Sequence, residues 1–171
     1  VSVCVSGSGN SQILHIFYSD LVDNDLRHAT FDGSNFKFEI VDGNGPVVQP
    51  YDQPNRVRTA SDVSISNACA STAIGLQVFY RDETQGILLG AFKGATGKWT
   101  YELVDGDRNT DNRTTGDVGT HLSAVAVGSK VSVIYDSVLQ VNQQKQIIVG
   151  EVRLATRTGN SPLWNYRTLD T

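Results

Sequence analysis

Residues 76–106, with the sequence LQVFYRDETQGILLGAFKGATGKWTYELVDG, decide the fold of this chain. The segment contains an apolar run that ends in Tyr-Arg-Asp, a second apolar run, and a third run that begins at Trp99 and closes on Val-Asp-Gly. Apolar and polar residues alternate in the third run, which is typical of a half-buried β-strand. Gly and Asp fill the gaps, as they do in tight hairpins. The segment therefore predicts three short antiparallel strands.

The same pattern occurs three times along the 171 residues. The anchors of the aromatic run are Tyr18, Tyr80 and Tyr135. The last strand begins at Phe36, Trp99 and Trp164 and closes at Asp42, Asp105 and Asp170, with offsets of 63 and 65 residues in both sets. A strand rich in small residues precedes each aromatic run, so each copy contains four strand candidates. Four antiparallel strands per repeat are typical of a β-propeller blade. We therefore predict an all-β propeller fold with three blades, at approximately 1–57, 58–112 and 113–171.

Three blades form an open arc, because propellers close with roughly four to eight. An open arc leaves edge strands exposed, and exposed edges are templates for aggregation unless they are paired. We expect either a homodimer that completes a six-bladed ring or further blades from the same parent protein. The chain begins at Val1 and contains no Met, so we also expect a processed or incomplete N-terminus. A compact closure of the prism or trefoil type is the alternative fold.

Composition and charge exclude several classes of function. The net charge of −4 argues against a nucleic-acid surface, which normally shows a basic patch. The apolar runs are too short to span a membrane. Two cysteines, Cys4 and Cys69, are too few for a zinc site, and no cofactor motif is present. They either pair with each other, if the first strands of two repeats are adjacent, or remain buried thiols.

No residues suggest catalysis. The chain has no G-x-S-x-G elbow, and its three histidines lack the spacing of metal ligands. The acids that follow the aromatic runs recur in every copy, which favours a role in turns, whereas a glycosidase needs a particular pair of carboxylates. Acids in the loops, such as Asp20, Asp23 and Asp25, are interpreted as solvated turn residues and not as a calcium site. We predict no enzyme activity and no bound metal.

The remaining class is carbohydrate binding. A sugar site needs an aromatic face for the apolar side of the ring and a few oriented polar groups for its hydroxyls. Each repeat offers both at fixed positions, so we predict sugar sites between neighbouring blades. The candidate residues are Tyr18, Asp20, His28, Tyr80, Asp82, Trp99, Tyr135 and Trp164.

The repeats, of the form apolar-FYxD … LRHA-x-x-DG … W-x-F/Y-E-x-V/L-DG, resemble those of secreted bacterial and fungal propeller lectins, and their general layout resembles the fungal fucose-specific lectins. The resemblance implies glycans or glycoproteins as partners and an extracellular location, with a cytoplasmic one left open. In the fucose lectins an Arg on the second strand and a Glu on the third bind the sugar. The matching positions are predicted to be His15, Gln77 and Ser132, and His28, Gly90 and Gly150. The Arg/Glu pair is missing from all three copies.

Two other functions stay open at this point. A structural or protein-interaction propeller would have Trp99 and Trp164 buried with no polar groups converging beside them. A propeller glycoside hydrolase of the sialidase type would have two close carboxylates at the centre of the ring.

Overall fold

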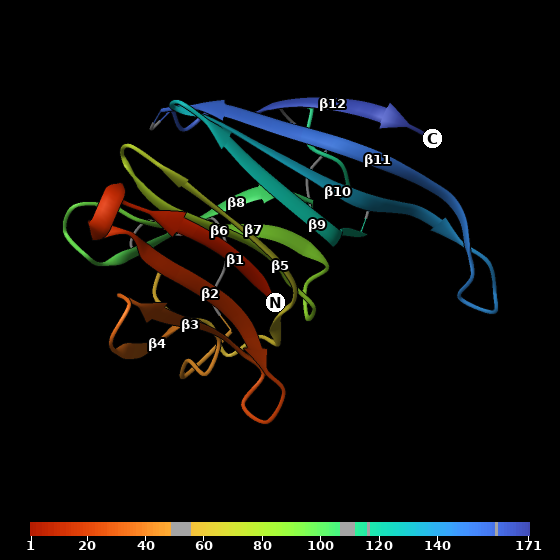
Figure 1. The fold of residues 1–171 in the computed structure, drawn as a ribbon. Helices are drawn as coiled ribbons and strands as arrows, with labels where there is room; N and C mark the ends of the chain where they lie inside the picture. The colour runs from red at the N-terminus through yellow and green to blue at the C-terminus, as the bar shows by residue number, and fades with distance from the viewer. Residues whose placement is uncertain (49–55, 107–111, 116, 160) are drawn as a thin grey trace.

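The structure is a computed structural model that describes residues 1–48, 56–106, 112–115, 117–159 and 161–171. It is all-β. Its strands form three separate four-stranded antiparallel sheets, which we call blades 1, 2 and 3 (Figure 1). The prediction of an all-β chain with three blades is confirmed. No helix among the described residues has the length and apolar character needed to cross a membrane.

Each blade is a meander whose strands lie in chain order. Blade 1 contains β1 (Ser2–Ser6), β2 (Ile13–Asp20), β3 (Asp25–Phe31) and β4 (Phe36–Asp42), with a short 3-10 turn at Gly9–Ser11. Blade 2 contains β5 (Val63–Thr72), β6 (Gly75–Asp82), β7 (Ile87–Lys93) and β8 (Trp99–Asp105). Blade 3 contains β9 (Asp117–Val127), β10 (Lys130–Val141), β11 (Ile147–Thr158) and β12 (Asn165–Asp170). The predicted blade limits fall in the segments between these sheets and stay predictions.

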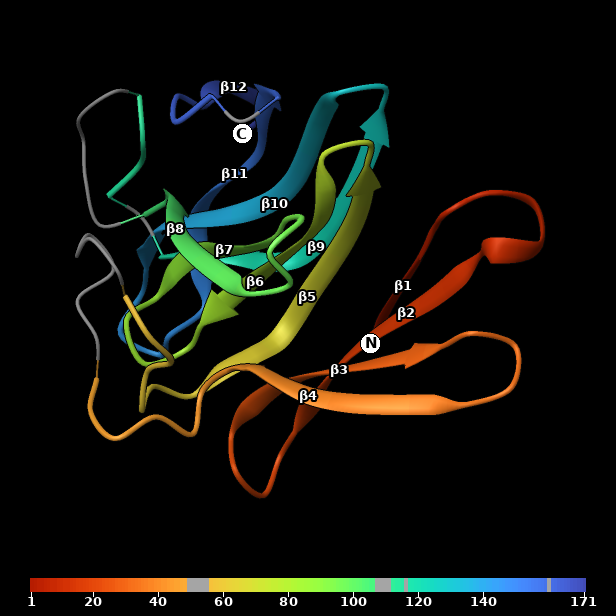
Figure 2. The same ribbon diagram turned by 90° about the vertical axis from the view of Figure 1, so that its left-hand side faces the viewer.

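The blades are arranged side by side, with blade 2 between the other two (Figures 1 and 2). The first strands, β1, β5 and β9, are neighbours along the inner side of the arc. Blade 2 is therefore covered on both faces, and its second strand is almost wholly buried. Blades 1 and 3 each have one covered face and one free face.

The core consists of two apolar layers, one at each junction between blades. The layer between blades 1 and 2 includes Phe17, Leu26 and Val78, all well buried. The layer between blades 2 and 3 includes Phe79, Leu88 and Val133. Burial of such side chains stabilises a fold by roughly 1.5–3 kcal/mol each. The blades are thus held together by the same kind of packing that forms a domain core.

A disulfide bond between Cys4 and Cys69 joins the inner strands of blades 1 and 2, with their Cα atoms 6.0 Å apart. These are the only two cysteines in the chain. The alternative in which they pair is therefore the one that the structure contains, and it follows from the adjacency of β1 and β5.

A buried Tyr–Asp–Arg cluster recurs at both junctions. The Tyr80 hydroxyl of blade 2 donates to Asp42 of blade 1 over 2.6 Å, and Arg56 donates to the same carboxylate. The Tyr135 hydroxyl of blade 3 donates to Asp105 of blade 2 over 2.5 Å. Arg153 donates to that carboxylate too. We call these two clusters the first and second interblade clamps.

The clamps keep their tyrosines protonated. Burial, followed by the charge of the adjacent aspartate, raises the pKa of Tyr80 and of Tyr135 far above the usual value. Each phenol therefore remains a neutral hydrogen-bond donor. Each carboxylate accepts charge-assisted hydrogen bonds, which are stronger than neutral ones.

Candidate functional site

Polar side chains converge beside a tryptophan at each junction, and we call these two places the interblade clefts. The first cleft is formed by His15, His28 and Glu39 of blade 1 with Lys93 and Trp99 of blade 2. Strand pairing places Phe17 opposite His28, and His28 opposite Glu39, so these three side chains share the face of blade 1 that meets blade 2. The alternation of side chains along each strand thus directs them all to one junction.

A continuous chain of hydrogen bonds crosses the first cleft. Ser6 Oγ lies 2.7 Å from His15 Nε2, and His15 Nδ1 lies 2.9 Å from His28 Nε2. His28 Nδ1 lies 2.7 Å from Glu39 Oε1. A carboxylate only accepts, so with neutral imidazoles His28 donates to Glu39, His15 donates to His28, and the Ser6 hydroxyl donates to His15. All donors in the chain then point towards Glu39.

Two groups of this cleft have shifted pKa values. Burial, and then the neighbouring His28, lowers the pKa of His15 to about 4, so its ring is neutral at pH 7. Burial raises the pKa of Glu39, but hydrogen bonds from His28 and Lys93 outweigh that effect and bring it to about 2. At neutral pH the cleft therefore holds a charged Glu39 carboxylate, to which Lys93 donates, and a neutral His15.

Trp99 closes one side of the first cleft. Its ring meets Phe17 and His28 edge-on, and the Lys93 ammonium lies 5.2 Å from the ring centre. The adjoining cavity has a volume of about 450 Å³. Several hydroxyl-bearing side chains line it together with His15 and Lys93, namely Ser6, Thr30, Ser71 and Thr72. Such a volume falls in the range of small-molecule sites.

The second cleft lies between blades 2 and 3 and is formed by Gln77, Glu102, Arg157 and Trp164. Arg157 donates to Glu102 over 2.6 Å and to Gln77 Oε1 over 2.8 Å. The Arg157 guanidinium lies 4.4 Å from the centre of the Trp164 ring, which meets Phe79 edge-on. The adjoining cavity of about 270 Å³ is lined by Glu102 and Arg157, among others.

The two clefts are equivalent within the repeat. Phe17 pairs with His28 in blade 1 as Phe79 pairs with Gly90 in blade 2. His28 pairs with Glu39 as Gly90 pairs with Glu102, so the two glutamates occupy one repeat position. Lys93 and Arg157 pair with Leu76 and Val131 and are likewise equivalent. Each cleft therefore combines an indole, a carboxylate and a cation.

Both clefts contain buried donors without a protein acceptor. Within the part of the chain that the structure describes, Trp99 Nε1 of the first cleft has no hydrogen-bond partner. The same holds for Gln77 Nε2 and Arg157 Nε of the second cleft. Leaving such a group unpaired costs about 1–3 kcal/mol. Such a donor is satisfied once an acceptor oxygen, from a ligand or an ordered water, comes within reach.

The structure brings only some of the predicted site residues into these clefts. His28 and Trp99 lie in the first cleft and Trp164 lies in the second. Tyr80 and Tyr135 are fully buried and belong to the interblade clamps.

Three other predicted residues lie outside both clefts. Asp82 is buried and accepts hydrogen bonds from Gln85 in the turn that follows β6. Asp20 accepts from the Val22 amide and pairs with Arg27. Tyr18 lies on the free face of blade 1, because it pairs with Arg27 in the row opposite to that of His28.

The register of blade 3 corrects one sequence match. Ile134 pairs with Leu154, so Leu154 and not Gly150 occupies the position of His28 and Gly90. The reason is the length of β10 and β11, which at 12 residues each place the glycine towards the hairpin turn.

Sequence reasoning missed the charged residues of the clefts, which are Glu39, Lys93, Glu102 and Arg157. Their repeat spacing is a usable signal, since the two glutamates lie 63 residues apart and the two cations 64, close to the anchor offsets of 63 and 65. An Arg/Glu pair does exist, between Arg157 and Glu102, but its members come from two different blades.

The fold has a counterpart among solved structures. The chain is similar to a fucose lectin from Kordia zhangzhouensis, solved in complex with methyl-fucoside. The TM-score is 0.52 at 11% identity, over 99% of each chain. At this identity the likeness shows a shared fold. No family model and no curated protein matches the sequence.

Within the described residues, no group of three or more His, Cys, Asp or Glu side chains is arranged to hold a metal ion. The acids Asp20, Asp23 and Asp25 all lie within 2.9 Å of the Arg27 guanidinium. Arg27 thus supplies the positive charge in this loop.

Proposed function

We propose that this chain is a carbohydrate-binding protein of the lectin type, with one sugar site in each interblade cleft. The observation that carries the proposal is the recurrence of an indole, a carboxylate and a cation at equivalent positions beside donors that lack a protein acceptor. The carboxylate accepts from sugar hydroxyls, and the unpaired donors supply their oxygens with hydrogen bonds. The indole covers the apolar side of the ring.

The fold likeness to a fucose lectin supports the proposal at the level of architecture. Trp164 is only 9% exposed and Trp99 is partly buried, so neither is an open stacking platform. The polar groups beside them distinguish these positions from plain core packing, which is what a purely structural propeller would contain. Two weak sites on one rigid body raise the overall affinity for multivalent glycans through effective concentration. We propose a location outside the cell, where such glycans are displayed.

A hydrolase is the second candidate, because the hydrogen-bonded series Ser6, His15, His28 and Glu39 resembles an activated serine. An effective general base has a pKa near the working pH. The pKa of His15 is about 4, so it is a weak base at neutral pH. We therefore assign this series a binding role.

A glycan array probed with the 171-residue chain tests the proposal. We expect binding to a related set of glycans that is abolished by the double substitution Glu39→Gln and Glu102→Gln. Thermal unfolding of the double variant serves as the control for folding. Absence of any glycan signal from folded protein contradicts the proposal, and release of p-nitrophenol from an ester or glycoside substrate would favour the hydrolase.

A further inference from the structure

The free face of blade 1 is a surface that takes no part in either cleft. It consists of residues that point away from blade 2, and its exposed apolar members are Val3, Val5, Phe36 and Phe38. Val3 pairs with Ile16, and Phe38 pairs with Ala29, so one side of the sheet is apolar from its inner to its outer strand. Contiguous exposed apolar surface of this kind marks an interaction site.

The equivalent face is buried in the other two blades. Ile16 corresponds to Val78 and Val133, which are 0% exposed beneath the preceding blade. Phe36 corresponds to Trp99 and Trp164, whereas it is itself 55% exposed. The face of blade 1 thus has the composition of a junction between blades, and no sheet among the described residues covers it.

The interblade clamps identify the missing surface at the level of single residues. Tyr18 is the repeat equivalent of Tyr80 and Tyr135, which donate to the aspartate of the preceding blade. Among the described residues, the Tyr18 hydroxyl makes no hydrogen bond. Tyr18 also pairs with Arg27, as Tyr135 pairs with Arg153, which completes the second clamp. Blade 1 therefore carries a tyrosine without the aspartate of a clamp, beside an arginine that pairs with three aspartates of its own blade.

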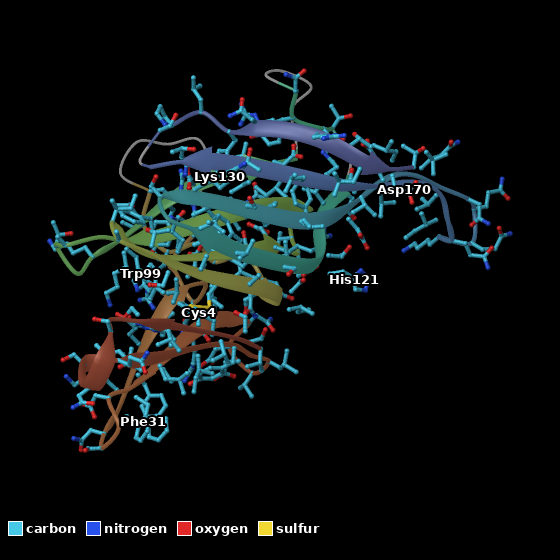
Figure 3. The ribbon with its side chains drawn as sticks, turned by 45° about the horizontal axis from the view of Figure 1, so that its top comes forward. Cys4, Phe31, Trp99, His121, Lys130 and Asp170 are labelled. Atoms are coloured by element: carbon cyan, nitrogen blue, oxygen red, sulfur yellow. A yellow bond between two sulfur atoms is a disulfide. The ribbon has the colours of Figure 1, made fainter. Side chains whose placement is uncertain are left out.

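Blade 3 carries the complementary half. Asp42, Asp105 and Asp170 are equivalent, because they pair with Leu26, Leu88 and Val152 at the same place in each sheet. Asp170 is exposed, and the contact recorded for its carboxylate is the adjacent Thr171 amide. Blade 3 thus offers an aspartate without a tyrosine. Figure 3 shows Phe31 at the outer side of blade 1 and Asp170 on blade 3, at opposite sides of the molecule.

A hollow beside Asp170 is placed to receive a tyrosine ring. It has a volume of about 270 Å³ and is lined by Asp170, Val152 and Val138, among others. In the first two blades the corresponding space is filled, since Tyr80 packs with Leu26 and Tyr135 packs with Leu88. The aspartate and the hollow therefore form one receptor for a phenol.

We propose that a second copy of this chain occupies both free faces, so that the Tyr18 hydroxyl of one copy, with Arg27 beside it, donates to Asp170 of the other. The same contact forms twice, and twofold symmetry closes the assembly, as in most soluble dimers. The occupant is a second copy because one chain carries both halves of the clamp. Exposed Val125, Val127 and Ile134 on the free face of blade 3 supply apolar surface to meet blade 1.

The junction between copies is expected to lack a third sugar site of the same kind. At the position of Glu39 and Glu102, blade 3 has Arg167, which pairs with Leu154. At the position of Lys93 and Arg157, blade 1 has Phe31, which pairs with Leu14. A carboxylate is thus replaced by a cation, and a cation by an apolar ring. This conclusion rests on the proposed function and limits it to two sugar sites per chain. Formation of the dimer, in contrast, depends on the clamp contacts and not on sugar binding.

The test is the solution mass of the 171-residue chain by analytical ultracentrifugation over a range of concentrations. We expect twice the chain mass of 18.5 kDa. Tyr18→Phe or Asp170→Asn is expected to raise the dimer dissociation constant about ten- to a hundredfold, as loss of a charge-assisted hydrogen bond implies. The double substitution should add little to either single one, because both remove the same contact.

Two control variants separate this contact from general damage. Tyr80→Phe removes the same hydroxyl from a clamp within the chain, so it should lower the unfolding temperature and leave the dimer mass unchanged. Val57 is as exposed as Val3, at 57%, but belongs to the segment that connects blade 1 to blade 2 in the sequence. Val3→Lys should disrupt the dimer and Val57→Lys should not. A monomer at every concentration, or a dimer indifferent to Tyr18 and Asp170, overturns the inference.

Sugar binding is measured on the same variants and separates the two proposals. Both clefts lie within one chain, so a monomeric variant should still bind two sugars, with weaker retention on a glycan surface. Sugar binding by a chain that never dimerises refutes only the assembly. A dimer sensitive to Tyr18 and Asp170 that binds no glycan refutes only the proposed function.

Discussion

The two interblade clefts occupy the same place in the repeat and differ in their polar residues. The first has two histidines and a lysine, whereas the second has Gln77, Gly90 and Arg157 at the same positions. The first cleft is hydroxyl-rich and its cavity is larger, about 450 Å³ against about 270 Å³. The fold thus supplies an indole and a carboxylate at both junctions, and under the proposed function the surrounding residues would set which sugar each cleft prefers.

The covalent link differs as well, because the disulfide crosses only the first junction. Replacing both cysteines, Cys4→Ala with Cys69→Ala, is expected to lower the free energy of unfolding by about 4 kcal/mol, given the 65-residue separation that the bond closes. Denaturant unfolding measures the loss. Sugar binding should weaken more in the first cleft than in the second, and equal weakening would contradict a local role.

The carboxylates give the next largest effect. Glu39→Gln and Glu102→Gln should each weaken binding in their own cleft by about 1.5–3 kcal/mol, the worth of a hydrogen bond to a charged group. Calorimetric titration with methyl glycosides should then show one sugar per chain in place of two. The control is Asp136→Asn, on the free face of blade 3, which should leave two sugars bound per chain. Loss of both sites from one substitution would show that the clefts are not independent.

His15 should make the stability contributed by the first cleft depend on pH. The pKa of His15 falls from 6.5 to about 4 on folding, so between these values the unfolded chain binds more protons than the folded one. The contribution of the neutral His15 to the free energy of unfolding is therefore complete above pH 6.5 and declines as the pH falls towards 4. His15→Gln, which copies the second cleft, should remove this part of the decline. Thermal unfolding from pH 4 to pH 7 measures both proteins, and identical profiles would contradict the assignment.

Substitutions of the two cleft cations should change the sugar affinity least. Arg157→Lys should weaken sugar binding in the second cleft by about 1 kcal/mol, because lysine cannot contact Glu102 and Gln77 together as the guanidinium does. Lys93→Arg should change binding in the first cleft by less than that, since the charge near Glu39 is kept. The same titrations measure both variants. A larger loss of affinity from Lys93→Arg than from Arg157→Lys would contradict this prediction.

The repeat and its strands could be predicted from the sequence, because a Tyr, a Phe or Trp, and an Asp recur as anchors in all three blades. The clefts were only partly predictable. Their tryptophans are anchors of the repeat, but their charged residues lie on different strands of two neighbouring blades. Bringing Glu102 to Arg157 requires knowing which face of each sheet meets the next, and periodicity along one strand does not show that.

The tyrosines show the opposite case. Tyr80 and Tyr135 recur for a structural reason, since each donates to an aspartate of the preceding blade. Recurrence alone therefore does not separate a ligand residue from a clamp. The match to Gly150 failed because β10 and β11 are 12 residues long, against 8 and 7 for β6 and β7, so the longer hairpin places the glycine nearer its turn. Residue spacing alone does not show how far a hairpin extends.

The central claim is that each cleft binds one sugar, and the chain contains two tryptophans, one in each cleft. Their two indole N–H signals in a ¹⁵N-correlated NMR spectrum therefore report the clefts separately. The account predicts that titration with a bound monosaccharide identified by the glycan array shifts both signals, with different affinities. A sugar that binds the chain while both indole signals stay unmoved would contradict it.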